Sequence, residues 1–373
     1  MDSPISQLAA KRPRSDSAAN ESLPSPEYIR SAPWFEDGNV ILEVERVRFK
    51  VYMGILAANS VIFRDMFAVA RADKGDDVEG CPVVHLEDNP KQLAYVLDAL
   101  HDSRKWIEDN DEGKPMPLTI LAAFLRIGRK YEIDHIRKKA IQRLAVAFPT
   151  ELGKCRDTFR QGYAKSISLR HTAGDLLLLI NIIRENELLV HLPMAFLKCI
   201  TRDLKDPKDP AHMSLFFPSL GIQQPILAYK DIELCVKASR TILRLQITDL
   251  FSWTQTFYVH GCGSNVCAER RRQLALPLFN PNPNAEHLFY TFNNWNSSWS
   301  TRFCQECDTF NRKKFAEAQQ KLFDMLPSMF QLPEWDDLRT KWSSVRFQNL
   351  RKHSNLTRLP VIYAPGFYPV TNI

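Results

Sequence analysis

The pattern of apolar and polar positions near the start of the chain predicts a β-hairpin. Val40, Leu42 and Val44 share one face of a first strand, with Ile41 as an additional apolar residue. Residues 47–51 alternate in the same way after a charged two-residue turn. Two alternating runs around a tight turn predict two antiparallel strands with one buried face.

Helical patterns follow the hairpin. Apolar residues at helical spacing reach an aromatic–Met–aromatic group, Phe63, Met66 and Phe67, which we expect to be buried between the hairpin and later helices. The next elements predicted are a strand at 82–86 and helices at 90–100, 118–133 and 136–147, the last ended by Pro149. Two polar segments, 72–80 and 103–117, are expected to be surface loops.

This order of elements resembles a BTB/POZ domain over residues 31–148, roughly a third of the chain. The family's Leu-x-x-x-Ser-x-x-Phe-x-x-Met-Phe helix is matched at Leu56, Ser60, Phe63, Met66 and Phe67. Residues 127–133 are similar to the Ala-x-x-Tyr segment of such domains, whereas Tyr52 stands where a His is common. The resemblance implies an α+β fold in which a short β-hairpin and sheet are capped by helices; an unrelated small α+β domain is the alternative.

The rest of the chain, residues 149–373, predicts a mostly α-helical C-terminal domain. The Leu-rich stretch 176–183 is apolar around more than one stripe, which favours an interior helix over a partner-binding groove. An amphipathic helix is expected at 310–326, ended by Pro327. A Cys-x-x-Cys pair, this charged helix and a following Leu-Pro-x-Trp-x-x-Leu stop resemble the C-terminal part of fungal BTB proteins of the basidiomycete type.

Four of the eight cysteines stand in two pairs within the segment 260–310: Cys262, Cys267, Cys304 and Cys307. Pairs of thiols a few residues apart let two short loops offer four sulfurs to one tetrahedral ion, the arrangement of a structural zinc site or knuckle. Free thiols that lie close together and a disulfide are the alternatives, and His260 is a substitute ligand. The other cysteines, Cys81, Cys155, Cys199 and Cys235, fall singly in apolar patterns and are expected in cores.

Composition narrows the class of protein. The chain has 373 residues, a length typical of two or three domains, and its 45% hydrophobic content is enough to form their packed cores. The formal charge of +6 is mild and does not by itself imply nucleic acid. No apolar leader or bilayer-length run is present, so we expect a soluble intracellular protein of the nucleus or cytoplasm without membrane contact.

Residues 1–30 are rich in Ser, Pro and charge and predict a disordered arm. Lys11-Arg12-Pro13-Arg14 within it is a weak nuclear import pattern, with a solvated charge run as the alternative. The basic runs 270–272 and 313–314, together with Trp295 and Trp299, would suit an acidic partner or nucleic acid. Solvated surface is the more ordinary interpretation, so nucleic acid is not the expected partner.

The function that these features predict is protein–protein interaction. Gly-x-Ser-x-Gly, phosphate-loop and His-Glu-x-x-His motifs are absent, so an enzyme is not expected. The BTB resemblance implies an adaptor or scaffold that dimerises or binds a cullin scaffold, including a substrate adaptor of a cullin-type ubiquitin ligase. A nuclear transcriptional or chromatin regulator is the alternative. Because little sequence precedes Asp37, and Pro33 limits any helix there, we expect a weak homodimer or a monomer.

Overall fold

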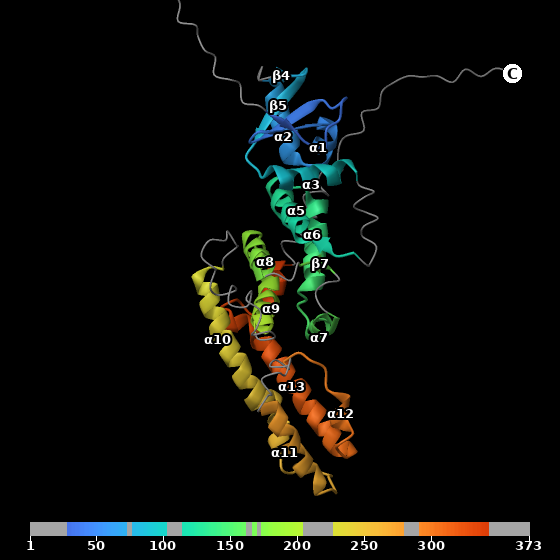
Figure 1. Ribbon diagram of the computed structural model, residues 1–373, viewed down its shortest axis with the longest axis vertical. Coiled ribbons are helices and arrows are strands. Elements are labelled where there is room, and N and C mark those ends of the chain that lie inside the picture. Colours follow the sequence, from blue (N-terminus) through green and yellow to red (C-terminus); the bar gives the residue numbers. More distant parts are fainter. Residues whose placement is uncertain are drawn as a thin grey trace, which may run out of the picture.

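The chain forms an elongated molecule with its β-sheet at one end (Figure 1). The computed structural model describes residues 28–72, 77–102, 114–161, 166–169, 173–203, 227–279 and 291–342. Helices of the C-terminal part extend away from the sheet, and residues 250–279 and 291–318, which we call the tip, lie at the opposite end (Figure 1).

The sheet contains β1 (Ile29–Arg30), β2 (Val40–Val44), β3 (Val47–Val51), β4 (Asp77–Val78) and β5 (Cys81–Leu86), in the order β1-β3-β2-β5-β4. β2 and β3 are antiparallel, which confirms the predicted hairpin, while β5 pairs with β2 in parallel. β1 adds to β3 in parallel and lies in the last residues of the segment expected to be disordered. The import pattern at Lys11–Arg14 lies outside the described residues.

The expectation of one buried face is wrong for β2, since all five of its residues are buried. β2 is the central strand, so side chains of both β3 and β5 flank its second face, with Arg48 and His85 opposite Glu43. Glu43 is buried on the second face, where its carboxylate accepts a hydrogen bond from Arg48 Nε (2.8 Å) and pairs with His85 Nδ1 (2.9 Å). A charge can be buried there because these partners replace water.

The described residues of this domain also form the helices α1 (Met53–Asn59), α2 (Val61–Ala72), α3 (Pro90–His101), α5 (Leu118–Lys130) and α6 (Asp134–Ala147). The single helix expected after the hairpin is divided at Ser60, whose backbone is extended. The Ser60 hydroxyl accepts from the Phe63 N–H (3.0 Å) and donates to the Tyr131 carbonyl (2.6 Å), so it begins α2 and ties it to α5. Phe63 and Phe67 are buried as predicted, and Met66 is half-buried.

Both predicted loops contain short strands in their described parts. β4 lies in the first, and β6 (Met116–Pro117) in the second pairs in parallel with β7 (Ile167–Ser168). This second pairing joins the N-terminal domain to the C-terminal part, and neither strand has enough residues for an alternating pattern.

The C-terminal part is helical, as predicted. Its helices are α7 (Leu152–Gln161), α8 (Ala173–Glu185), η2 (Leu189–His191), α9 (Leu192–Asp203), α10 (Tyr229–Leu245), η3 (Gln246–Leu250), η4 (Ser252–Gln255), α11 (Val266–Phe279), α12 (Ser297–Ser300) and α13 (Gln305–Met329), and residues 335–342 are also helical. The Leu-rich helix α8 is interior: all six of its predicted apolar positions are at most 2% exposed. α8 and α9 share one continuous hydrophobic core with the N-terminal domain.

The predicted end of the long helix at Pro327 is wrong, because α13 continues to Met329. A proline lacks the N–H that would bond to the carbonyl four residues earlier, here that of Phe323. That carbonyl instead accepts the indole N–H of Trp335 (2.8 Å), so the missing bond is replaced. Among the described residues, no helix has both the length and the apolar character needed to cross a membrane.

Candidate functional site

The four paired cysteines converge at the tip. The sulfurs of Cys262, Cys267, Cys304 and Cys307 all lie within 4.8 Å of one another, and Cys262 Sγ is 3.8 Å from Cys304 Sγ. Four sulfurs about 2.3 Å from a central tetrahedral ion would be separated by about 3.8 Å. The predicted convergence of two pairs that lie far apart in the sequence is therefore confirmed.

Local structure places each sulfur. Cys262 follows a turn in which Gly261 has φ +81°, a backbone conformation that residues with a Cβ rarely adopt. The N–H of Cys262 donates to the Val259 carbonyl (3.1 Å). Cys267 lies in the first turn of α11. Cys304 is the N-cap residue of α13, and Cys307 lies in the first turn of that helix. Two helix starts and one glycine turn thus bring the thiols together.

Two alternatives to a shell of four thiols are a disulfide and a substitution by His260. All eight cysteines lie in the described part of the chain and are free, so the structure contains no disulfide. His260 is exposed and is not part of the cluster. Residues 256–259, which precede it, carry no regular structure. Cys81, Cys155, Cys199 and Cys235 are buried, as predicted.

A buried arginine adjoins the cluster. Arg271 is 1% exposed; its Nε donates to Asn311 Oδ1 and its Nη1 to the Thr256 carbonyl, each at 3.1 Å. Its Nη2 has no hydrogen-bond partner within the described residues. Burial and the neighbouring thiols raise the pKa of the Cys307 thiol, while the charge of Arg271 acts in the opposite direction.

These residues fit a thiophilic tetrahedral ion. Thiolates are soft ligands, and four of them complete a shell that has no open position. Such a centre carries negative charge, which the guanidinium of Arg271 would offset. Val259, Phe303 and Phe310 pack around the thiols, of which Cys262 and Cys304 stay half-exposed. The cluster therefore has the donors, spacing and charge compensation of a structural metal centre.

In the sequence, Arg271 looks like its exposed neighbours Arg270 and Arg272 in the basic run. A signal was nevertheless present, because Cys267, Arg271 and Leu274 are spaced four and three residues apart and so share one face of α11. All three are buried. Cys267 and Leu274 are residue types that are usually buried, so their spacing marks the inward face of the helix, and Arg271 lies on that face between them.

The basic–aromatic surface, the less ordinary interpretation of these residues, is not found as one exposed surface among the described residues. Trp299 is buried and Trp295 half-buried, and both pack with Trp253 and Phe315 in a hydrophobic cluster of the tip. Most cations of the two basic runs have partners: Arg270 donates to the Arg302 carbonyl, Arg272 pairs with Glu269, and Lys314 pairs with Glu317. Packing thus buries Trp299 and covers part of Trp295, so the two rings do not form an exposed pair for stacked bases.

At the other end, the N-terminal domain follows the plan expected from the sequence, with helices closed over a sheet that is centred on the hairpin. Tyr52, in the position where a His is common, packs against Phe35 and His101 at ring-centroid distances of 4.9 and 6.0 Å. A comparison with curated proteins gives no match. A family model described as the BTB/POZ domain matches residues 35–146. This chain therefore contains a BTB/POZ domain, a domain that mediates protein–protein interactions, at residues 35–146.

Proposed function

We propose that this protein is an adaptor or scaffold that uses its BTB domain to bind one protein and its helical part to hold another. The observation that carries the proposal is the BTB/POZ domain at residues 35–146. The shared core with α8 and α9 supports it, because a continuous apolar core holds the two parts in a defined relation. A cullin scaffold of a ubiquitin ligase is the BTB partner that we favour.

Affinity purification of the tagged full chain, followed by cross-linking and mass spectrometry, tests this proposal. A scaffold held by the BTB domain should cross-link to Lys91 and Lys130, which are exposed on that domain. Lys237 and Lys313, exposed on α10 and α13, serve as internal controls and should link to other proteins. Recovery of a cullin only through the α10 and α13 lysines would contradict the assignment.

Zinc is the metal that we propose for the four cysteines. Cys262, Cys267, Cys304 and Cys307 would bind it as thiolates, and a bound ion would supply a structural tether between α11 and α13. A complete shell of four protein ligands supports a structural role and is one reason to propose a non-enzymatic protein. Purified protein should contain about one zinc per chain. The double substitution Cys304→Ser and Cys307→Ser should remove it, and Cys81→Ser should not.

A weak homodimer or a monomer remains our proposal for self-association. The described residues before Asp37 include β1, which pairs with the chain's own β3, so they are already used within one molecule. Sedimentation velocity over a range of concentrations tests this. A tight dimer at nanomolar concentration that dissociates when residues 1–35 are removed would contradict it.

A nuclear regulator remains the second candidate. What supports it is the pattern Lys11–Arg14 and the exposed Lys313, whereas the packing of Trp295 and Trp299 weakens it. Retention on DNA that falls steeply with salt would favour this candidate over the adaptor. The narrower resemblance to fungal BTB proteins stays a prediction.

A further inference from the structure

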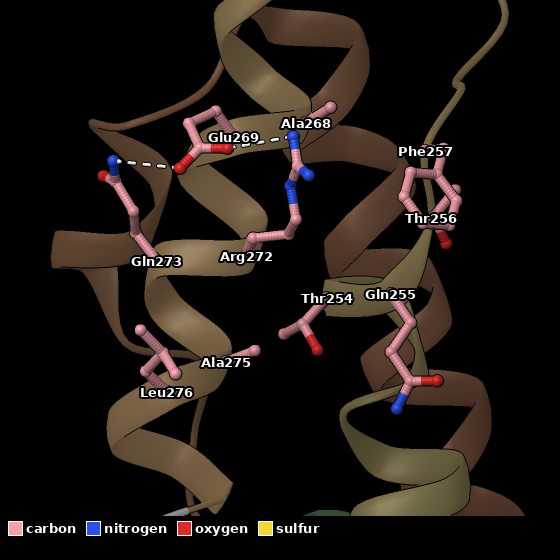
Figure 2. A pocket seen from close by; sticks show the side chains of 10 residues that line it. All are labelled: Thr254, Gln255, Thr256, Phe257, Ala268, Glu269, Arg272, Gln273, Ala275 and Leu276. Atoms are coloured by element: carbon pink, nitrogen blue, oxygen red, sulfur yellow. Dashed lines mark hydrogen bonds and ion pairs between the residues drawn. The ribbon is translucent and has the colours of Figure 1, made fainter.

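A groove at the tip has no role in the features described so far. It has a volume of about 590 Å³ and lies between residues 254–257 on one side and α11 on the other (Figure 2). The α11 side is lined by Ala268, Glu269, Arg272, Gln273, Ala275 and Leu276.

Large apolar side chains are exposed at this groove. Phe257 is 77% exposed and Leu276 is 71% exposed, and both line the groove from opposite walls. The neighbouring Tyr258 is 73% exposed. Single exposed apolar residues are ordinary, but several around one concave surface mark an interaction site.

At the end of the wall formed by residues 254–257, some backbone groups have no partner among the described residues. Thr256 has an extended backbone, and its own N–H and carbonyl are bonded to Trp253 and Arg271. For Phe257 and Tyr258, in contrast, no hydrogen bond is formed within the described part of the chain. Unpaired backbone groups beside a groove are a template for an extended peptide, whose own backbone can bond to them.

Charge indicates which peptide would fit. α11 carries three arginines and one glutamate in residues 269–272. Arg271 is buried, but Arg272 lines the groove with a side chain that is 61% exposed and pairs with Glu269 at 2.9 Å. This ion pair uses only Nη2 of Arg272. Among the described residues Nε and Nη1 have no partner, so the guanidinium can bond a carboxylate of a partner while Glu269 stays in place.

We propose that this groove binds an extended acidic segment of a partner protein, with an apolar side chain of that segment seated between Phe257 and Leu276. The inference rests on the proposed adaptor function and names the class of ligand for the end of the molecule opposite the BTB domain (Figure 1). Specificity comes from Arg272 and the unpaired backbone, and affinity from burial of the two apolar side chains.

The test selects ligands directly on the purified full chain. A phage-displayed library of random short peptides is selected on the wild-type protein, and the consensus peptide is measured by fluorescence polarisation. The consensus should combine apolar residues with Asp or Glu. Leu276→Glu and Arg272→Glu should each weaken its binding by about tenfold or more. The matched controls Val69→Glu on α2 and Arg240→Glu on α10, both at exposed positions, should leave binding unchanged.

Several results would overturn the proposal. These are a basic consensus, no selected peptide, or equal binding by wild type and both groove variants. A dimer in sedimentation experiments that Leu276→Glu abolishes would assign the groove to a second copy of the chain instead. Because Arg272 and Leu276 are exposed, circular dichroism and the thermal midpoint should match wild type. The peptide assay contains no BTB partner. Loss of peptide binding with cullin binding intact would therefore contradict the groove proposal alone, and loss of cullin binding with peptide binding intact would contradict the adaptor proposal alone.

Discussion

The two ends of this molecule are stabilised in different ways. The BTB domain and α8–α9 share one continuous core, which contains Phe63, Phe67 and the whole apolar face of β2. The tip instead has a small aromatic cluster around Trp253 and a separate cluster around the four thiols. Apolar burial is sufficient to stabilise the first region. The apolar clusters of the second region are small, so we expect a bound metal ion to contribute to its stability.

The comparison shows why the candidate metal centre and the groove occur together. Segment 254–257 leads into Cys262, and α11 contains Cys267, so both walls of the groove are connected to the thiol cluster. A bound ion would hold the separation of these walls. In the BTB domain, by contrast, no such device is needed, because packing sets the positions of its surfaces.

The largest effect is expected in the BTB core. Phe67→Ala removes a ring that is 3% exposed and should lower the free energy of unfolding by about 3–5 kcal/mol. Urea denaturation measures it. Val69→Ala, two residues away on the exposed side of α2, should change stability by less than about 0.5 kcal/mol. Similar effects for both substitutions would break the contrast between core and surface on which our description of this domain rests.

If the four thiols hold zinc, as proposed, its removal should act on the tip alone. A chelator should increase amide hydrogen exchange in the second turns of α11 and α13, where the amides are bonded within the helix, by about 100-fold. This factor corresponds to about 2.7 kcal/mol of lost binding stabilisation. Amides of α5 should keep their exchange rates, because their core is independent of the thiols. Equal acceleration in α5, or none in the tip, would show that the two regions do not differ in this way.

Acid should weaken the shared core through His191. This side chain is buried, its Nδ1 bonds to the Phe148 carbonyl (2.9 Å), and desolvation lowers its pKa to about 4. The unfolded chain, with a His pKa near 6.5, therefore takes up the proton first, and stability is lost as the pH falls from about 6.5 to 4. The loss between pH 7 and pH 5 should be about 2 kcal/mol.

His191→Asn isolates this contribution, because asparagine does not titrate in the range and retains a side-chain N–H. Denaturation of both proteins at pH 7 and pH 5 gives the difference in their pH dependence. Acid effects at the tip are common to both proteins and cancel. An unchanged pH dependence in the variant would exclude His191 as the cause.

The smallest effect concerns the start of α2. Ser60→Ala removes the hydroxyl that bonds to the Phe63 N–H and the Tyr131 carbonyl and should cost about 1 kcal/mol. Thermal or urea unfolding measures it, with Ser239→Ala in α10 as control. A neutral Ser60→Ala would mean that α2 is held by its apolar face alone.

Local features of the sequence determined much of the fold. Alternation at period two is sufficient for the β2–β3 hairpin, Pro90 marks the start of α3, and the crowded apolar positions of α8 require an interior helix. The spacing of the cysteine pairs determined which residues gather at the tip. These features were predictable because each depends on residues only a few positions apart, where backbone geometry and side-chain period are known.

Tertiary structure decided what depends on distant partners. Glu43 is buried because β5 and Arg48 reach it, α13 passes Pro327 because Trp335 bonds to the freed carbonyl, and Arg271 turns inward toward the thiol cluster. The groove between residues 254–257 and α11 exists only once both segments are placed. A hydrogen bond or an ion pair can offset the local penalty of a proline or a buried charge, and whether such a partner arrives is settled by the packing of the whole chain.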